Sequence, residues 1–81
     1  MKEVKHPGKI LACMLHEDQV TMTTFAKKMD VPSSRLSEIL SGKRSITVDS
    51  AVRIGRVLGE NPEDWLALQN EFDLYQYSLA S

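Results

Sequence analysis

Apolar residues recur three and four positions apart along this chain, in short segments separated by residues typical of helix ends. Pro7 stands before the first segment, and proline suits the first turn of a helix because its missing amide hydrogen is not needed there. The apolar positions that follow are Ile10, Leu11, Met14 and Leu15. The pattern predicts a first helix over about residues 7–17.

The second segment begins at a residue that can cap a helix. Thr21 offers a side-chain oxygen to the first free amides of the helix. Val20 before it and Phe25 after it have the spacing of a hydrophobic staple. A helix is therefore predicted over about residues 22–30. The apolar face of this helix consists of Phe25, Ala26 and Met29.

A proline again marks the start of the third segment. Pro32 interrupts the preceding helix, because the residue before a proline avoids the helical conformation, and it can itself begin the next one. Gly42 accepts the left-handed conformation that often follows a helix. We therefore predict a helix over about residues 32–41. Its core positions are Leu36, Ile39 and Leu40.

Two more helices follow from the same signals. Thr47 is a second capping residue, and Asp49 stands where the helix dipole favours an anion, which predicts a helix over about residues 48–58. Asn61 and Pro62 begin the last helix, which is predicted over about residues 62–79. An apolar stripe runs along that helix at Trp65, Leu68, Phe72, Tyr75 and Leu79.

These elements predict an all-α fold, a compact bundle of five helices in which residues 1–81 form a single domain. No segment shows the alternation of a strand. The second and third helices are short and are joined at residues 29–32, which is the spacing of a helix-turn-helix. A chain of 81 residues buries a modest core, so a partner subunit would help to stabilise it.

The charge of the chain is unevenly distributed. The formal net charge is −1, which by itself argues against a nucleic-acid partner. Residues 1–56, however, carry all ten basic residues and six acidic ones, a balance of +4, whereas residues 57–81 carry five acidic residues and no base. This asymmetry indicates that the two parts either face different partners or are two ordinary solvated surfaces.

Metal and catalytic chemistry find little support in the sequence. Cys13 and His16 are three positions apart, and His6 lies upstream, but a structural zinc normally needs a fourth ligand. Cys13 is expected to be a small, semi-buried apolar residue. No phosphate-binding glycine loop or paired-carboxylate cleft is present. We therefore expect no metal, no cofactor and no enzymatic activity.

The segment from Thr21 to Lys28, together with Ser41, Gly42, Lys43 and Arg44, resembles the DNA-binding core of the Cro/C1-type (XRE) family. His6–Gly8, Ile46–Thr47 and the segments Asn61–Gln69 and Asp73–Tyr75 are similar to those of HigA-type (VapI-like) antitoxins. The resemblance covers nearly the whole chain from His6 to Tyr75. It implies the lambda-repressor-like helix-turn-helix fold. Pro32 departs from the pattern, because it replaces the hydroxyl or amide cap common before a recognition helix.

If the third helix is the recognition helix, its outward residues face the major groove. Arg35 is expected to pair with a guanine and Glu38 to accept from a cytosine amine, while the short serines contact bases or phosphates. The amino end of the second helix and the basic loop are expected to hold phosphates. The predicted DNA-binding residues are Thr21, Thr23, Ser33, Ser34, Arg35, Ser37, Glu38, Lys43 and Arg44.

One small domain reads few base pairs, so we expect a homodimer on an inverted repeat. The last helix is predicted to form the subunit contact, and Trp65 is expected to lie in the core. The predicted interface residues are Leu68, Phe72, Tyr75, Tyr77 and Leu79.

The family resemblance also implies a protein partner, a RelE-like (HigB-like) mRNA-cleaving toxin, and repression of the chain's own operon. Acidic residues 60–73 and the N-terminal segment are both candidate toxin-binding surfaces. The alternatives are a stand-alone phage-type repressor and a helical interaction module that does not bind DNA. No signal peptide or membrane span is apparent, so a cytoplasmic location is expected.

Overall fold

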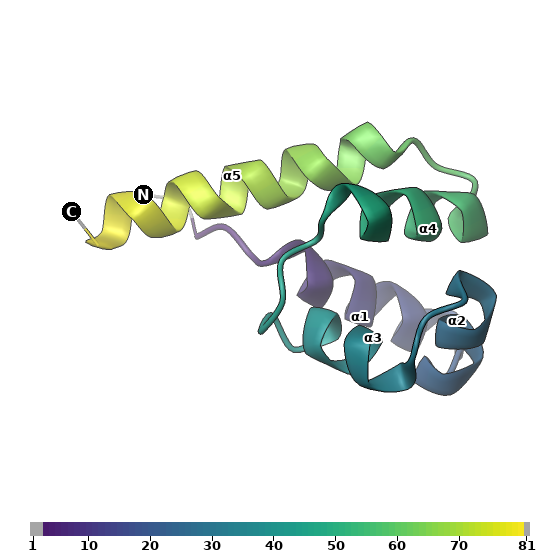
Figure 1. Ribbon diagram of the computed structural model, residues 1–81. Helices are drawn as coiled ribbons and strands as arrows, with labels where there is room; N and C mark the ends of the chain where they lie inside the picture. The colour runs from purple at the N-terminus through teal and green to yellow at the C-terminus, as the bar shows by residue number, and fades with distance from the viewer. Residues whose placement is uncertain (1–2, 81) are drawn as a thin grey trace.

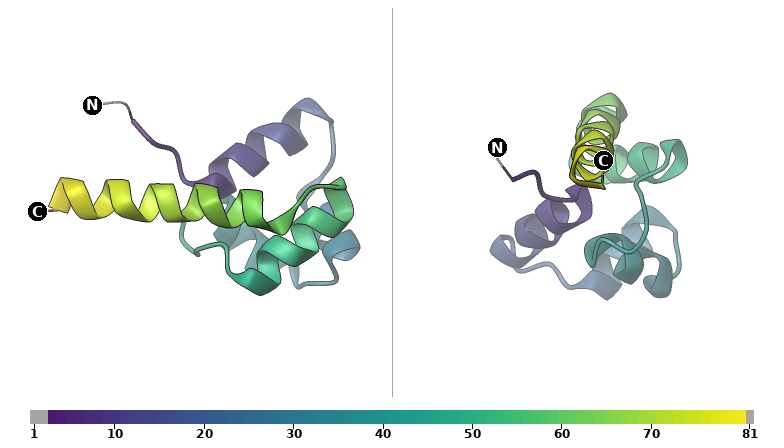
Figure 2. Two further views of the ribbon diagram at one scale, coloured as in Figure 1. Left: turned by 90° about the horizontal axis from the view of Figure 1, so that it is seen from above. Right: turned by 90° about the vertical axis from the view of Figure 1, so that its left-hand side faces the viewer.

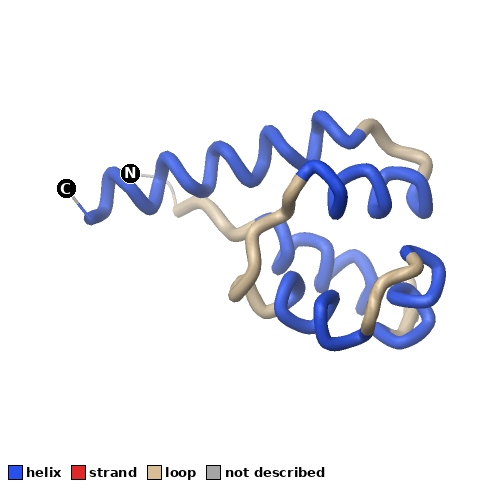
Figure 3. The backbone as a smooth tube through the Cα atoms, viewed as in Figure 1, coloured by secondary structure: helices blue, strands red, loops and turns tan. Residues whose placement is uncertain are grey.

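The computed structural model describes residues 3–80, and within that range it contains five α-helices and no strand (Figures 1 and 3). The all-α prediction is confirmed. The helices are α1 (Pro7–Glu17), α2 (Met22–Met29), α3 (Ser33–Leu40), α4 (Val48–Leu58) and α5 (Pro62–Ala80). Each boundary lies within one residue of the position predicted from the sequence. No helix among residues 3–80 is both long and apolar enough to cross a bilayer.

The predicted threonine caps are present. The Thr21 hydroxyl accepts a hydrogen bond from the Thr24 amide at the start of α2, and Thr47 does the same for the Ser50 amide at the start of α4; each bond is 3.2 Å long. Gly42 and Gly59 both have positive φ, at 83° and 73°, and follow the ends of α3 and α4. These four residues show why short polar and glycine signals locate helix ends reliably.

The turn between α2 and α3 differs slightly from the prediction. Helix α2 ends at Met29 because Asp30 takes the left-handed conformation, with φ of 60°. Pro32 is extended, with ψ of 145°, and provides no side-chain cap, so α3 begins at Ser33 rather than at the proline. The turn is therefore closed by backbone hydrogen bonds, such as the one that the Val31 amide donates to the Ala26 carbonyl.

The helices form two groups. Helix α3 packs against α1 and α2, while α4 packs along α5 and also contacts α2. Figure 2 shows the second half of α5 extending past the other helices, on the same side as the segment that leads into α1. The molecule measures 39 × 21 × 21 Å, and its long dimension follows α5.

The buried core draws on every helix. It consists of Leu11, Leu15, Phe25, Ala26, Met29, Leu36, Ile39, Ile46, Ala51, Ile54 and Trp65. Trp65 is 3% exposed, and its indole nitrogen donates to Glu60 at 2.9 Å, so it is a core residue as expected. The prediction of a semi-buried Cys13 is wrong: this residue is exposed, because it lies on the opposite face of α1 from Leu11 and Leu15. Leu40 is only partly buried.

Helices α1 and α3 are in close contact at a glycine. A Cβ atom at Gly8 would overlap the Ile39 carbonyl oxygen at the end of α3. The absence of a side chain at Gly8 therefore sets the distance between these two helices. Because α3 is the predicted recognition helix, this contact also fixes where its last turn lies.

We expect Gly8→Ala to lower the free energy of unfolding by about 2–3 kcal/mol, because the helices must separate to admit the methyl group. The control is Gly59→Ala: a Cβ atom there meets no atom within 4 Å, so only the left-handed backbone is penalised, by about 1 kcal/mol. Urea unfolding measures both. An equal or smaller loss for Gly8→Ala would show that α1 and α3 are not in tight contact.

Candidate nucleic-acid interface

Helix α3 presents a row of small polar side chains to solvent. Ser34, Ser37, Glu38 and Ser41 are exposed, and Ser33 is half-buried. Leu36 and Ile39 on the opposite face are completely buried. The short serines leave the backbone of α3 open to close approach from outside, as insertion into a DNA groove requires.

The amino end of α2 also reaches the surface. Thr21 and Thr23 are exposed. Thr21 satisfies only the Thr24 amide, whereas the first amides of any helix have no partner within the helix. The exposed amino end of α2 is thus accessible to an anion, and the phosphate contact at Thr21 and Thr23 stays a prediction.

Arg35 is held against α4 and is only partly exposed. Its Nη2 donates to an Asp49 carboxylate oxygen at 2.5 Å and to the Ser50 hydroxyl at 2.9 Å, both on α4. Only 26% of the Arg35 side chain is exposed. The guanine contact predicted for Arg35 would require these bonds to be given up, so the geometry favours a role in holding α3 against α4.

The Asp49 carboxylate also binds a second arginine, which sequence reasoning missed. Arg53 Nε donates to both Asp49 oxygens, at 3.0 and 3.1 Å. Its Nη1 donates to the carbonyls of Met29 and Asp30 at the end of α2, at 2.9 and 3.2 Å. One carboxylate thus connects α4 to both helices of the helix-turn-helix. The spacing of Asp49 and Arg53, four residues apart on one helix, is the signal that could have found this pair.

The two arginines lower the pKa of Asp49 below its ordinary value, chiefly through the hydrogen bond from Arg35 and then through that from Arg53. Both contacts stabilise the ionised carboxylate and together outweigh the opposing effect of desolvation on its pKa. Asp49 is therefore charged throughout the neutral range.

The loop after α3 carries the predicted basic residues. Lys43 and Arg44 are both exposed. Arg44 donates from Nε and Nη2 to one oxygen of Glu38, at 3.2 and 2.7 Å, so the two residues form an ion pair on the surface beside α3. Lys43 is fixed through its backbone, because its amide donates to the Glu38 carbonyl at 2.9 Å.

Gln69 holds the far end of this loop and was not expected from the sequence. Its buried side-chain oxygen accepts from the Ile46 amide at 2.8 Å, and its nitrogen donates to Asp73 at 2.9 Å. Gln69 lies four residues after Trp65 and three before Phe72, so the spacing of the apolar stripe already placed it on the inner face of α5. Helix α5 thereby positions the loop that carries Lys43 and Arg44.

The residues predicted for the subunit contact fall into two groups. Leu68, Phe72 and Tyr75 are partly buried within the protomer. Tyr77 and Leu79 are exposed by 75% and 59%, and Leu74, which was not predicted, by 62%. The most exposed apolar side chains of α5 thus lie on its last two turns.

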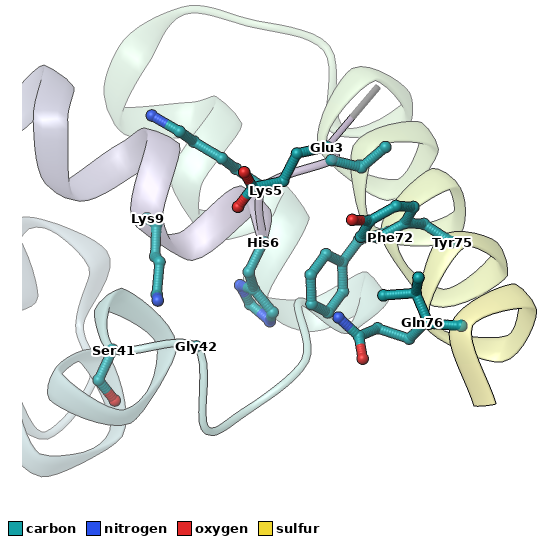
Figure 4. Close-up of a pocket in the computed structure, with 11 residues that line it drawn as sticks. Glu3, Lys5, His6, Lys9, Ser41, Gly42, Phe72, Tyr75 and Gln76 are labelled. Atoms are coloured by element: carbon teal, nitrogen blue, oxygen red, sulfur yellow. The ribbon is translucent and has the colours of Figure 1, made fainter. Parts of the chain in front are cut away.

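A cleft of about 340 Å³ lies between residues 3–6, Gly42 and this part of α5 (Figure 4). His6 forms its buried end: the ring meets Phe72 edge to face at 5.0 Å, and Nδ1 accepts from the Gly8 amide. Burial lowers the pKa of His6, with Lys9 acting in the same direction and Asp73 opposing. The neutral imidazole is favoured, which keeps Nδ1 available as the acceptor that caps α1.

The helix-turn-helix family profile matches residues 18–66, more than half of the chain. The chain belongs to the XRE-type helix-turn-helix family. It is 37% identical over 76 residues to the uncharacterized transcriptional regulator YddM of Escherichia coli K12. The aligned region covers 91% of this chain and 81% of YddM. Among residues 3–80, no cluster of three or more His, Cys, Asp or Glu side chains could hold a metal ion.

Solved structures of antitoxins have the same fold. An addiction module antidote protein of the HigA family from Coxiella burnetii is 40% identical, with a TM-score of 0.85 over 90% of this chain and 80% of that one. The antitoxin HigA of Pseudomonas aeruginosa, solved with its higBA promoter, is 29% identical with a TM-score of 0.91, covering 96% and 86%. These similarities support the interpretation of this chain as a DNA-binding regulator of the antitoxin type.

We expect Asp49→Asn to lower the melting temperature at pH 7, because Arg35 and Arg53 lose their shared charge. The stabilisation by Asp49 is present above about pH 4 and disappears as the pH falls through the lowered pKa of its carboxyl group. Thermal unfolding at pH 7 and near pH 3 measures this, with exposed Glu17→Gln as a control expected to be near neutral. A deficit of the same size at both pH values would contradict the assignment.

Proposed function

We propose that the chain is the antitoxin of a toxin–antitoxin module, which binds operator DNA through α3 and represses its own operon. The observation that carries this proposal is the exposed serine face of α3, flanked by the amino end of α2 and by the basic loop. The likeness to HigA of Pseudomonas aeruginosa, which was solved with promoter DNA, supports it over nearly the full length. In this proposal the chain acts by binding rather than by catalysis, and it meets operator DNA and the toxin in the cytoplasm.

The proposed contacts divide by role. Thr21, Thr23 and Lys43 bind phosphates and set the register of the protein on the duplex. Ser33, Ser34 and Ser37 approach base edges in the major groove, together with the pair of Glu38 and Arg44. Arg35 acts as a positioning residue through Asp49.

We further propose that two copies bind an inverted repeat, with their α3 helices about 34 Å apart. The free apolar surface at the end of α5 supports a homodimer, because water-exposed Leu74, Tyr77 and Leu79 gain by burial against a second copy. Leu79 lines the cleft together with Phe72 and Tyr75, whereas Leu74 and Tyr77 lie on another side of α5.

The proposed protein partner is a RelE-like toxin. A nuclease that holds RNA needs a basic surface, and the second part of this chain is purely acidic. Glu63, Asp64 and Glu71 are all exposed on α5. This acidic side of α5 is therefore the proposed toxin-binding surface.

The proposed binding to operator DNA is tested by a mobility-shift assay on the DNA upstream of the gene, at two salt concentrations. We expect specific binding, two protomers per duplex, and a steep loss of affinity with salt. Lys43→Ala should weaken binding to all sequences alike and reduce the salt slope by about one. Arg56→Ala is the charge-matched control, because Arg56 is exposed on the last turn of α4, the end far from the loop. Wild-type binding no tighter than to random duplexes would refute this half.

The toxin half is tested by co-expression with the toxin-like reading frame next to the gene. Wild type should relieve growth arrest, whereas the charge reversal Glu63→Lys with Asp64→Lys should fail to do so while still binding the operator. Continued arrest with wild type, alongside intact operator binding, would point to a stand-alone repressor instead.

A further inference from the structure

The ion pair between Glu38 and Arg44 has a geometry that an ordinary surface salt bridge does not need. Arg44 Nε and Nη2 both donate to the same Glu38 oxygen, Oε1. The Arg44 amide also donates to the Glu38 carbonyl at 3.2 Å. Three hydrogen bonds thus fix both the backbone and the guanidinium of Arg44 relative to the last turns of α3.

This arrangement leaves the end of the guanidinium free. An arginine has five N–H donors, and Glu38 engages one on Nε and one on Nη2. Nη1 has no hydrogen-bond partner among residues 3–80, and 49% of the Arg44 side chain is exposed. Nη1 and the second hydrogen of Nη2 therefore form a free two-donor edge beside the serine face of α3. Two parallel donors at this separation match the O6 and N7 acceptors of guanine.

The chemistry of Glu38 points the same way. A carboxylate on a DNA-facing surface repels phosphates, so a residue that merely anchors the backbone gains nothing from such a neighbour. An arginine that reads a base does benefit from an acidic neighbour such as Glu38. Held in one orientation, its side chain loses less conformational freedom on binding and presents its donors in a fixed plane.

Arg35, the arginine within α3, uses both hydrogens of Nη2 for Asp49 and Ser50, so its Nη1 and Nη2 cannot together present a two-donor edge without losing one of these bonds. Its side chain is also half as exposed as that of Arg44. The serines carry single short hydroxyl groups. Arg44 is thus the residue of this surface with a free, oriented pair of donors.

We propose that Arg44 is the specificity-determining residue of the chain, which reads a guanine in each operator half-site, and that Glu38 is its positioning residue. This inference rests on the proposed DNA-binding function and deepens it by naming the base that is read. It also reassigns Arg44 from phosphate anchoring, and Glu38 from cytosine recognition, to one joint role.

The test uses duplexes selected by the wild-type protein from a random pool, and then the same duplexes with each guanine replaced in turn by 7-deazaguanine, which lacks the N7 acceptor. For wild type, one guanine per half-site should be critical, with a loss of about 5- to 150-fold on replacement. Arg44→Lys keeps the charge but not the planar fork, so it should bind the unmodified duplex more weakly and show a clearly smaller penalty at that guanine. Glu38→Gln should reduce the same penalty.

Lys43→Ala is the matched comparison, since it removes a neighbouring charge and should leave the penalty at the critical guanine unchanged. Thermal unfolding of Arg44→Lys and Glu38→Gln should match wild type, because the pair lies on the surface. An Arg44→Lys variant that keeps the full guanine penalty would overturn the inference, as would a Glu38→Gln variant that binds more tightly with unchanged selectivity. A pool from which wild type selects no sequence refutes the proposed function itself.

Discussion

The orientation of the helix-turn-helix depends on one carboxylate. Asp49, in the first turn of α4, binds Arg35 of α3 and also Arg53, which in turn holds the carbonyl ends of α2. Helices α2 and α3 have eight residues each, too few to be stable alone, so their relative position is imposed by the rest of the molecule. The apolar core supplies the packing, and the contacts of Asp49 and Arg53 connect α3 and the end of α2 to α4. The close approach at Gly8 fixes the other end of α3.

This use of arginine changes how the charge of the chain is interpreted. From the sequence, the balance of +4 over residues 1–56 was compatible with a partner-facing surface and with an ordinary solvated one. In the structure, Arg35 and Arg53 form ion pairs with Asp49, and Arg44 forms one with Glu38. The basic residues therefore shape and orient the surface as much as they attract phosphate. A surface of this kind relies on positioned donors, and less on long-range attraction, for its selectivity.

Local signals in the sequence were sufficient to predict where the helices begin and end. Thr21 and Thr47 cap as predicted, and Gly42 takes the left-handed conformation, because these effects act within a few residues. The site was harder to predict, since its decisive contacts join residues far apart in the chain. Arg35 and Asp49 are 14 positions apart, and Gln69 reaches back 23 positions to Ile46. A helical pattern identifies Arg35 as polar, but only the packing of α4 shows that it faces a carboxylate. Likewise, the stripe on α5 predicted contact residues without showing that Phe72 is engaged by His6.

The central claim is that α3, held by Asp49, and the loop after it form the DNA-binding surface. Nuclear magnetic resonance of the labelled protein, titrated with a duplex from its own upstream region, tests this most directly. The predicted result is that amide signals shift at Thr21–Thr24, along α3 and at Lys43–Arg44, while the side-chain signal of Arg35 Nε stays nearly unchanged. Shifts confined to α1 or α5, or a large change at Arg35 Nε, would contradict the claim.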